Sequence, residues 1–332
     1  MTFNDIVEFA ERYDNLYIYG AGEMGKFLLE ALKDKDIEVS GFIVSDDQSI
    51  AKPTRFGIPV IKLSNWHKSD AVLNSGIFIA LSTYYRANIV NNLKEKNIFD
   101  YFVVQNEALN ESIRKLHPIK SENFLHTINP VSRSWGFERG KPIDRVYIEK
   151  FLQNASKDLQ GASDILEVGS DDYSRKFFPD TVKPVKYHVL HYEQGMDLTN
   201  EKTLQKDLCD VFICTQVFNF IYDVKSAIRG AYYLLKPGGT LLTTVQGCIG
   251  QTSRTDMKLW GDYWRFTDLG FGKLVKEVFG EEQVQVYPYG NALAATAFVQ
   301  GLAMEDLPDA TLLDPIESEY AINIGIIAHK KG

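Results

Sequence analysis

The sequence predicts an α/β protein made of two Rossmann-like, doubly wound domains. Two series of short apolar strands, each alternating with amphipathic helical stretches, run along the chain, and such alternation is typical of parallel βαβ units. A glycine-rich turn follows the first strand of the first series, and a single-glycine turn follows the first strand of the second. The length of 332 residues also suits two domains of roughly 100–200 residues each. We predict a first domain over 1–105, a linker with a short helix over 106–140, and a second domain over 141–332.

The first series begins at Asn15 with "NLYIYG", a short apolar strand. In "EMGKFLLEALKDK" the apolar residues Met24, Leu28, Leu29 and Leu32 have the spacing of one helical face. Further strands are predicted at "IEVSGFIVSDD", "GIPVIKL", "GIFIALS" and "YFVVQN", and a helix at "RANIVNNLKEKN". The short helix of the linker is predicted at "EALNESIRKLH".

The second series begins with a helix at "IDRVYIEKFLQNAS". Strands are predicted at "DILEVG", "KYHVLH", "DVFICTQ" and "TLLTTVQ", with the helix "DVKSAIRGAYYLLK" ahead of a "PGG" turn. The chain then closes with two β-rich stretches, "QVQVYPYG" and "YAINIGIIAHKK", separated by a mostly helical segment. The last two strands of this sheet are therefore expected to depart from the βαβ rhythm.

Composition and charge exclude several classes of function. Hydrophobic residues make up 45% of the chain and charged residues 24%, close to the average for soluble globular proteins. The net charge of −8 and the lack of a stripe of Lys and Arg argue against a nucleic-acid partner. The longest apolar runs are too short and too interrupted to span a bilayer, and the first residues do not resemble a secretory signal. We expect a cytoplasmic protein with no membrane span.

The three cysteines, Cys209, Cys214 and Cys248, lack the spacing of metal ligands. Two of them lie in apolar, strand-like stretches. We expect buried, reduced thiols and no metal site.

The first turn, "GAGEMG", has the dinucleotide-binding spacing G-x-G-x-x-G between a strand and a helix. Gly20 permits the tight turn, Gly22 lets the backbone approach a phosphate, and Gly25 allows close helix packing. Asp46 or Asp47, at the end of the next strand, is the candidate for a ribose contact. The motif predicts a bound nucleotide such as NAD. The alternative is a domain retained for packing or for dimerisation into a homo-oligomer.

The pieces "IYGAGEMGKFLLEAL", "VSGFIVSDD", "FGIPVI" and "IFIALST" carry a first resemblance. Over residues 15–105 the chain resembles the N-terminal domains of bacterial polysaccharide-biosynthesis proteins, including sugar acetyltransferases and nucleotide-sugar dehydratases. The resemblance implies a nucleotide or nucleotide-sugar ligand here, with the chemistry carried out by the other domain.

A second resemblance rests on "PVSRSWGFERGKPIDRVYIEKFL", "ILEVGSDDYSRKF", "VLH", "DLT", "TQVFNFIYDVKSAIRGAYYLLKPGGTLLTTVQG", "WGDYWRFT" and "YGNALAATAFVQGLAMEDL". Over residues 130–307 the chain resembles bacterial class I methyltransferase-like proteins linked to glycan biosynthesis. The resemblance implies a class I methyltransferase fold that uses S-adenosylmethionine to methylate a sugar or sugar-derived acceptor in surface polysaccharide biosynthesis, most simply on oxygen. Only "YEQGM" separates "VLH" from "DLT", where the group has a longer connection, so we expect the third strand to be lost.

In methyltransferases of this type the first strand ends in an acidic residue followed by a glycine, and Glu167 and Gly169 hold these positions. They are expected to line the methionine and ribose end of the cofactor. Ser170 stands where a further glycine is frequent, so the loop must reach the cofactor with a less permissive backbone. His191 closes the second strand, where an acidic ribose ligand is more common, and Asp197 is the candidate for the adenine.

Four more residues are cofactor-binding candidates. Thr215 and Gln216 end the fourth strand beside the switch point, where ligands of open α/β sheets bind. Arg145 and Tyr147, on the preceding helix, are expected to close over the carboxylate of the cofactor. For each candidate in this domain, the alternative is a polar residue that caps a strand or helix.

The stretch "WGDYWRFT" at 260–267 gathers aromatic rings, an acid and an arginine after the fifth strand. Rings stack on sugar faces, and charged groups orient hydroxyls or phosphate. The predicted acceptor-binding residues are Trp260, Tyr263, Trp264 and Arg265. Asp262 and His191 are the candidates for the base that removes a proton from an acceptor hydroxyl. The alternative is an aromatic cluster that only anchors a loop.

Two rival functions stay open. A nucleotide-sugar oxidoreductase or epimerase would use NAD at the first glycine turn and a Tyr-x-x-x-Lys pair. The match in this sequence is Tyr232 with Lys236, at a helix end before "PGG" where a catalytic pair is not expected. A non-catalytic ligand-binding scaffold would fit the sparse second glycine loop and the shortened connection.

Overall fold

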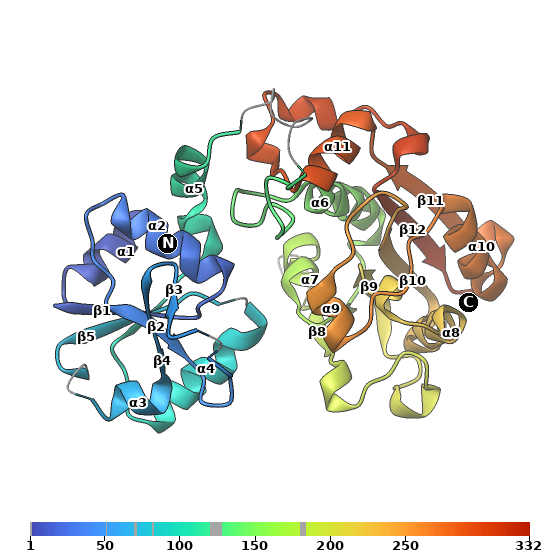
Figure 1. The fold of residues 1–332 in the computed structure, drawn as a ribbon. Coiled ribbons are helices and arrows are strands. Elements are labelled where there is room, and N and C mark those ends of the chain that lie inside the picture. Colours follow the sequence, from blue (N-terminus) through green and yellow to red (C-terminus); the bar gives the residue numbers. More distant parts are fainter. Residues whose placement is uncertain (1, 51, 70–71, 82, 120–127, 180–183) are drawn as a thin grey trace. The chain divides into compact units, whose positions relative to one another are not determined.

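The computed structural model describes residues 2–50, 52–69, 72–81, 83–119, 128–179 and 184–332. It divides the chain into two compact units, Met1–Gly140 and Lys141–Gly332 (Figure 1). The described part of 106–140, the expected linker, belongs to the first unit and contains the helix α5 (Asn110–Leu116). Each unit is built on its own six-stranded sheet. The prediction of two doubly wound, Rossmann-like α/β domains is confirmed.

In the first unit the strand order is β3-β4-β2-β1-β5-β6. The strands pair in parallel except β3, which runs antiparallel to β4. The strands are β1 (Asn15–Tyr19), β2 (Gly41–Val44), β3 (Thr54–Arg55), β4 (Ile58–Lys62), β5 (Ser75–Ile79) and β6 (Tyr101–Val103). The other helices are α1 (Phe3–Ala10), α2 (Glu23–Lys33), α3 (Leu63–His67) and α4 (Thr83–Glu95).

Both faces of the first sheet are covered, because successive side chains of a strand point to opposite faces. Leu16 and Ile18 of β1 lie in a cluster with residues of α1, α2 and α5. Tyr17 and Tyr19 lie in a second cluster with residues of α3 and α4. The sheet is thus a buried layer between two layers of helices.

The glycine turn between β1 and α2 has the geometry that its spacing predicts. Gly20 has a φ of +111°, which a side chain rarely allows. A Cβ at Gly25 would lie 2.0 Å from the carbonyl oxygen of Gly20. Gly22, the N-cap of α2, has no atom within 4 Å of the place where a Cβ would stand. Gly25 therefore permits close packing, and Gly22 leaves open space.

In the second unit the strand order is β11-β12-β10-β9-β7-β8. From β8 to β10 the strands are parallel, whereas β12 runs antiparallel to both β10 and β11. The expected departure of the last two strands is confirmed. The strands are β7 (Asp164–Val168), β8 (Lys186–Leu190), β9 (Cys209–Thr215), β10 (Leu235–Gln246), β11 (Val284–Tyr289) and β12 (Asn323–His329). The helices are α6 (Ile143–Ala155), α7 (Asp172–Phe177), α8 (Val224–Leu234), α9 (Arg254–Leu259), α10 (Asp268–Phe279) and α11 (Ala292–Gln300).

The connection from β8 to β9 is short and contains no strand along residues 191–208, all of which are described. It forms two 3-10 turns, Tyr192–Gln194 and Glu201–Thr203. The expectation that this connection contains no strand is confirmed, and β8 is the edge strand of the sheet, beside β7.

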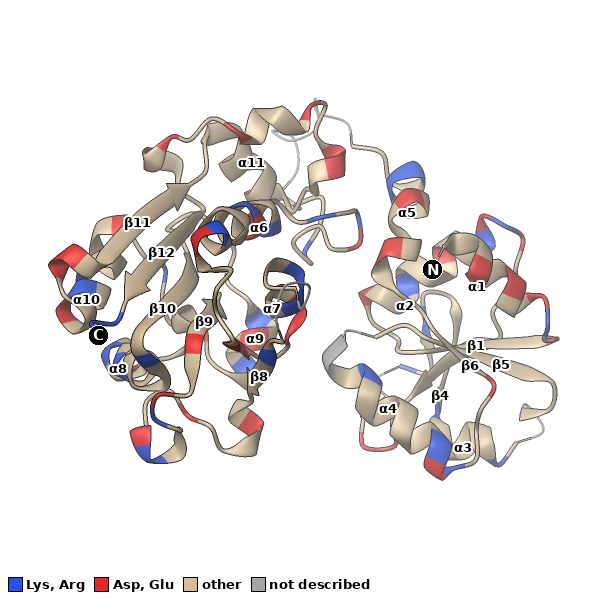
Figure 2. Cartoon of the chain, turned by 180° about the vertical axis from the view of Figure 1, so that it is seen from behind, with Lys and Arg blue, Asp and Glu red and all other residues tan. Residues whose placement is uncertain are grey.

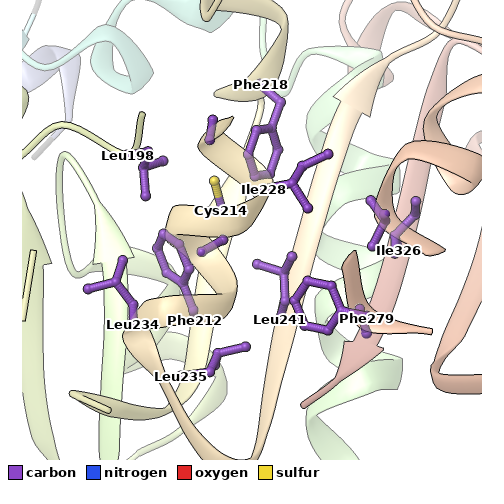
Figure 3. Packing of buried hydrophobic residues seen from close by; sticks show 14 of the residues in the cluster. Leu198, Phe212, Cys214, Phe218, Ile228, Leu234, Leu235, Leu241, Phe279 and Ile326 are labelled. Carbon is purple, nitrogen blue, oxygen red and sulfur yellow. The ribbon is translucent and has the colours of Figure 1, made fainter. Parts of the chain in front are cut away.

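The core of the second unit contains two of the three cysteines. Cys209 and Cys214 of β9 are fully buried, and burial raises the pKa of both thiols. Figure 3 shows Cys214 among Phe212, Leu234 and other apolar side chains. Cys248 differs from our expectation, because it is exposed in the segment that follows β10.

Charged side chains are mixed in sign. Figure 2 shows Lys and Arg beside Asp and Glu on α2, α6 and α10. Within the described ranges, no helix has the length and apolar character needed to cross a bilayer. The same residues include no group of three His, Cys, Asp or Glu side chains placed to hold a metal ion.

A matched pair of substitutions tests the glycine turn. Gly25→Ala places a methyl group against the Gly20 carbonyl and is expected to destabilise the first unit by about 1–3 kcal/mol. Gly22→Ser, whose Cβ enters open space at an N-cap, is expected to be neutral or slightly stabilising. Urea unfolding followed by far-UV circular dichroism measures both. Equal loss in the two variants would contradict the packing role of Gly25.

Candidate functional site

The carboxyl ends of β7, β9 and β10 form the candidate site of the second unit. The chain passes from β7 to β8 on one side and from β9 to β10 on the other, so the connections reverse between β7 and β9. Ligands of open α/β sheets bind at this kind of switch point. Most of the predicted cofactor residues lie on segments that meet this edge.

The turn after β7 is open at its glycine. Gly169 has a φ of +79°, and no atom lies within 4 Å of the place where a Cβ would stand. Its N–H donates to the carbonyl oxygen of Leu190 at 3.0 Å, which fixes the turn to the end of β8. Ser170 follows, half-buried. The backbone here is held in a left-handed conformation with free space above it.

Glu167 stabilises this turn through hydrogen bonds to the start of α7. Its side chain is 3% exposed, and it accepts hydrogen bonds from the N–H (2.7 Å) and hydroxyl (2.8 Å) of Ser174 and from the N–H of Tyr173 (3.3 Å). Burial raises the pKa of Glu167 even though these hydrogen bonds oppose the shift. The carboxylate thus joins β7 to the start of α7, and it affects a ligand through the shape of the loop.

Gln216 directly follows β9 and has a left-handed conformation, with a φ of +57°. Its N–H donates to the carbonyl of Thr244 at 2.7 Å, and its Nε2 donates to Oδ1 of Asn323 at 3.1 Å. The side chain therefore crosses β10 toward β12. Thr215 is half-buried and pairs with Thr244 in the sheet.

The first turn of α6 places Asp144 and Arg145 near the same carboxyl ends of the strands. Asn323 Nδ2 donates to the backbone oxygen of Asp144 at 3.4 Å, which connects this turn to Gln216. Oδ1 of Asp144 is buried and has no hydrogen-bond partner. Burial raises the pKa of Asp144 against the opposing charge of Arg145. Arg145 Nη1 lies 3.4 Å from the hydroxyl of Tyr173, at the start of α7.

Tyr147 is placed differently from our expectation. It has no exposed surface, and its ring lies 5.8 Å from the ring of Tyr289 in the core between α6 and β11. Burial raises its pKa to about 12. The ring therefore packs the core, and its hydroxyl is buried without a hydrogen-bond partner.

The two candidates after β8 lie in the short connection. His191 is half-buried directly after the strand. Oδ1 of Asp197 accepts hydrogen bonds from the N–H and the hydroxyl of Thr199, both at 2.8 Å. Asp197 therefore stabilises a turn with at least one of its carboxylate oxygens.

Sequence reasoning missed two buried amides at the same edge. Asn219 is 1% exposed in the turn after β9, and its Oδ1 has no hydrogen-bond partner. Gln246 is the last residue of β10, and its Nε2 is likewise buried without a partner. Their positions at the carboxyl end of β10 and in the turn after β9 were the available signal.

Asp262 and Arg265 form an ion pair inside the 250–266 segment. Asp262 Oδ1 and Oδ2 lie 2.5 and 2.8 Å from the two Nη atoms of Arg265, and the Ser253 N–H donates to Oδ2 at 2.9 Å. Arg265 also donates to the carbonyl of Gln251 at 2.9 Å. The Asp262 side chain has no exposed surface. Burial alone would raise its pKa, but the bonds from Arg265 and Ser253 lower it. This geometry suits loop structure and makes Asp262 a weak base.

The aromatic residues of this segment form two ring groups, each with one tyrosine that sequence reasoning missed. Tyr222 stacks on Trp264 at a centroid distance of 5.9 Å and meets Tyr263 edge-on at 5.5 Å. Tyr192 meets Trp260 edge-on at 6.3 Å. Tyr222 is 71% exposed and Tyr263 52%. We call this set the aromatic surface: Tyr192, Tyr222, Trp260, Tyr263 and Trp264.

The aromatic surface is tied to the end of β9. The backbone oxygen of Asn219 accepts the N–H groups of Tyr263 (2.9 Å) and Trp264 (3.2 Å), and Trp264 Nε1 donates to the carbonyl of Ile221 at 3.1 Å. The rings therefore anchor a loop and are also exposed, so both of the expected roles are compatible with their positions.

Two further sets of candidates lie elsewhere. Asp46 of the first unit accepts the N–H of Ser64 at 2.9 Å, and this bond lowers its pKa, so its carboxylate caps α3.

Lys236 of the second unit lies 2.6 Å from Asp164 and 3.0 Å from Asp210, at the amino ends of β7 and β9. Tyr232 and Lys236 thus lie at the amino ends of the strands, whereas the switch point lies at their carboxyl ends.

No protein-family model and no curated protein matches the chain. Among solved structures, a SAM-dependent methyltransferase from Archaeoglobus fulgidus is similar at 10% identity and a TM-score of 0.36, over 56% of this chain and 94% of that one. Phosphoethanolamine N-methyltransferase 2 of Haemonchus contortus, in complex with S-adenosyl-L-methionine, is similar at 9% and 0.35, over 99% of both chains. The [4+2]-cyclase SpnF is similar at 13% and 0.35, over 58% of this chain and 83% of that one. At such values these likenesses carry no argument about the activity of this chain.

The ion pair of the 250–266 segment can be tested by substitution and by pH. Asp262→Ala leaves the half-buried Arg265 without its carboxylate and is expected to cost about 1–3 kcal/mol of stability. The pair's contribution is present above the ordinary aspartate pKa of about 3.9 and is lost as the pH falls through the lower folded pKa. Hydrogen exchange of residues 250–266, measured at pH 7 and below pH 4, checks both. Unchanged protection in the variant would contradict this role.

Proposed function

We propose that the second unit is an S-adenosylmethionine-dependent methyltransferase that acts on a hydroxyl of a sugar or sugar-derived acceptor, in the cytoplasmic steps of surface polysaccharide biosynthesis. The observation that carries the proposal is the open turn at Gly169. It lies at the switch point of a doubly wound sheet, after a strand that carries a buried acid in the position expected of a methyltransferase.

The residues around this turn fit the methionine end of the cofactor, which carries an ammonium and a carboxylate. Asp144 offers a buried oxygen without a partner to the ammonium. Arg145, the next residue, offers a guanidinium to the carboxylate. Gly169 and Ser170 provide backbone close to the same end, and Thr215 and Gln216 border it at the end of β9. The assignment gives the buried Asp144 oxygen a hydrogen-bond partner, without which its burial is costly.

His191 and Asp197 follow β8 and are proposed to contact the ribose and adenine. The loss of the third strand leaves this side of the site to the short 191–197 connection. Asp197 already uses one carboxylate oxygen and its backbone groups in a turn, so we assign it a contact through its remaining carboxylate oxygen.

The acceptor is proposed to lie on the aromatic surface. Exposed, stacked rings present large apolar faces suited to the C–H face of a sugar. S-adenosylmethionine supplies an electrophilic methyl group when bound. His191, on the segment that also carries Tyr192, is then the better of the two candidate bases, because Asp262 is held by Arg265.

For the first unit we propose a nucleotide-type ligand, NAD or a nucleotide-sugar, with its phosphate at the start of α2. Gly22 caps this helix without a side-chain hydrogen bond and leaves open space in front of it. Asp46 is assigned to α3 instead of a ribose.

Calorimetric titration tests cofactor binding. The full chain is expected to bind S-adenosylmethionine, and Arg145→Met is expected to weaken binding at least tenfold, since it removes the partner of the carboxylate. Arg229→Met, which removes an exposed arginine from α8, serves as the matched control and should bind as wild type. Absence of binding by the folded wild-type chain would refute the methyltransferase and favour a scaffold. Saturable binding of NAD instead would favour the oxidoreductase.

Transfer of a radiolabelled methyl group to a panel of UDP-, GDP- and dTDP-sugars tests the acceptor site. Trp264→Ala is expected to lower the transfer rate at least tenfold while the affinity for S-adenosylmethionine stays the same, because the ring belongs to the aromatic surface. Tyr287→Ala, at a partly exposed position of β11, is the control. Loss of cofactor affinity in Trp264→Ala would instead assign the ring to loop structure.

A further inference from the structure

The first unit contains a cavity of about 650 Å³ that the glycine-turn motif does not account for. Its volume lies within the range of roughly 300–1,000 Å³ usual for small-molecule sites. One wall is formed by the first two turns of α2, with Glu23, Lys26 and Phe27. The facing wall is formed by the end of α5 and by described residues of 129–139.

Glu138 is a buried acid at this cavity. It is 3% exposed, and its Oε2 has no hydrogen-bond partner. Its carboxyl group has a hydrogen bond with Ser132, whose own Oγ accepts the N–H groups of Ser134 and Gly136 at 2.9 and 3.1 Å. Ser132 and the residues bonded to it therefore fix the position of Glu138, and one carboxyl oxygen of Glu138 stays without a hydrogen-bond partner. A buried carboxyl oxygen without a partner costs free energy, and a ligand group that donates a hydrogen bond would remove this cost.

Charges around the cavity favour a partly anionic ligand. Lys26, Arg133 and Arg139 line it, against the two acids Glu23 and Glu138. Burial, together with the nearby charge of Glu23, raises the pKa of Glu138 against the opposing effects of Ser132 and Arg139. With three basic side chains against two acids, the lining is net positive even when both acids are ionised. The first turn of α2, whose N-cap is Gly22, adds uncapped N–H groups at its positive end.

We propose that this cavity binds a phosphorylated, hydroxyl-bearing small molecule, with a hydroxyl on Glu138 and the phosphate toward Lys26 and the start of α2. A hydroxyl suits Glu138 because it can both donate and accept. The inference rests on the proposal that the first unit binds a ligand, adds Glu138 as the residue that selects hydroxyl groups, and is independent of methyl transfer. A sugar phosphate and a nucleotide share the required chemistry.

Titration of the full chain with glucose 1-phosphate, AMP, glucose and inorganic phosphate tests the proposal. Glucose 1-phosphate or AMP is expected to bind at least tenfold more tightly than glucose or inorganic phosphate. The ratio of the affinities for glucose 1-phosphate and AMP separates a sugar phosphate from a nucleotide. Glu138→Leu should remove this preference while inorganic phosphate binds as before. Lys26→Met should weaken all the phosphates, whereas Lys33→Met, at an exposed position of the same helix, should not.

The unliganded variants separate binding from structure. Because Glu138→Leu removes a buried oxygen without a partner, its melting temperature is expected to equal or exceed that of wild type, and Glu138→Gln, which keeps the shape, should fold and show the same loss of selectivity in weaker form. A fall in melting temperature with unchanged selectivity would overturn the proposal. So would the failure of every probe to bind. S-adenosylmethionine is titrated in the same samples, so failure of the cavity and failure of the methyltransferase give different results.

Discussion

The candidate site of the second unit depends on the hydrogen bonds between Glu167 and the start of α7. One buried carboxylate accepts the hydroxyl of Ser174 and two backbone N–H groups, and so joins the end of β7 to the next helix. The turn between them must then pass through Gly169 with a positive φ. The free space above that turn, and the approach of Tyr173 to Arg145 on α6, both follow from this connection.

A second constraint sets the opposite wall of the site. The Asp262–Arg265 pair and the two N–H bonds to the Asn219 carbonyl fix a long segment after β10 against the end of β9. Rings of this segment meet a ring from the connection after β8 in one group and a ring from the connection after β9 in another. The charged side chains of this segment bond to each other and to backbone groups within the segment.

The absence of a third strand was expected from a resemblance to a known group. Local patterns predicted every strand except the two-residue β3, the sheet class, and the roles of Gly20 in the turn and Gly25 in close packing. These properties depend on residues close together in the chain. The partners of Asp262 and Asp46, the burial of Tyr147, and the addition of Tyr192 and Tyr222 to the aromatic surface depend on side chains brought together by tertiary packing. Asn219, Gln246 and Glu138 are noticed because each has a buried atom without a partner, a property that no sequence pattern encodes.

The loss of the third strand also changes the border of the second sheet. β8 is the last strand on its side, so the outward backbone groups of its five residues have no ladder partner in the described sheet. Exposed strand edges invite pairing with other chains, and short edges with charged residues discourage it. β8 begins with the exposed Lys186 and passes within two residues of its end into a 3-10 turn. The shorter connection therefore leaves β8 as an edge strand, and the exposed Lys186 and the turn after β8 discourage its pairing with another chain.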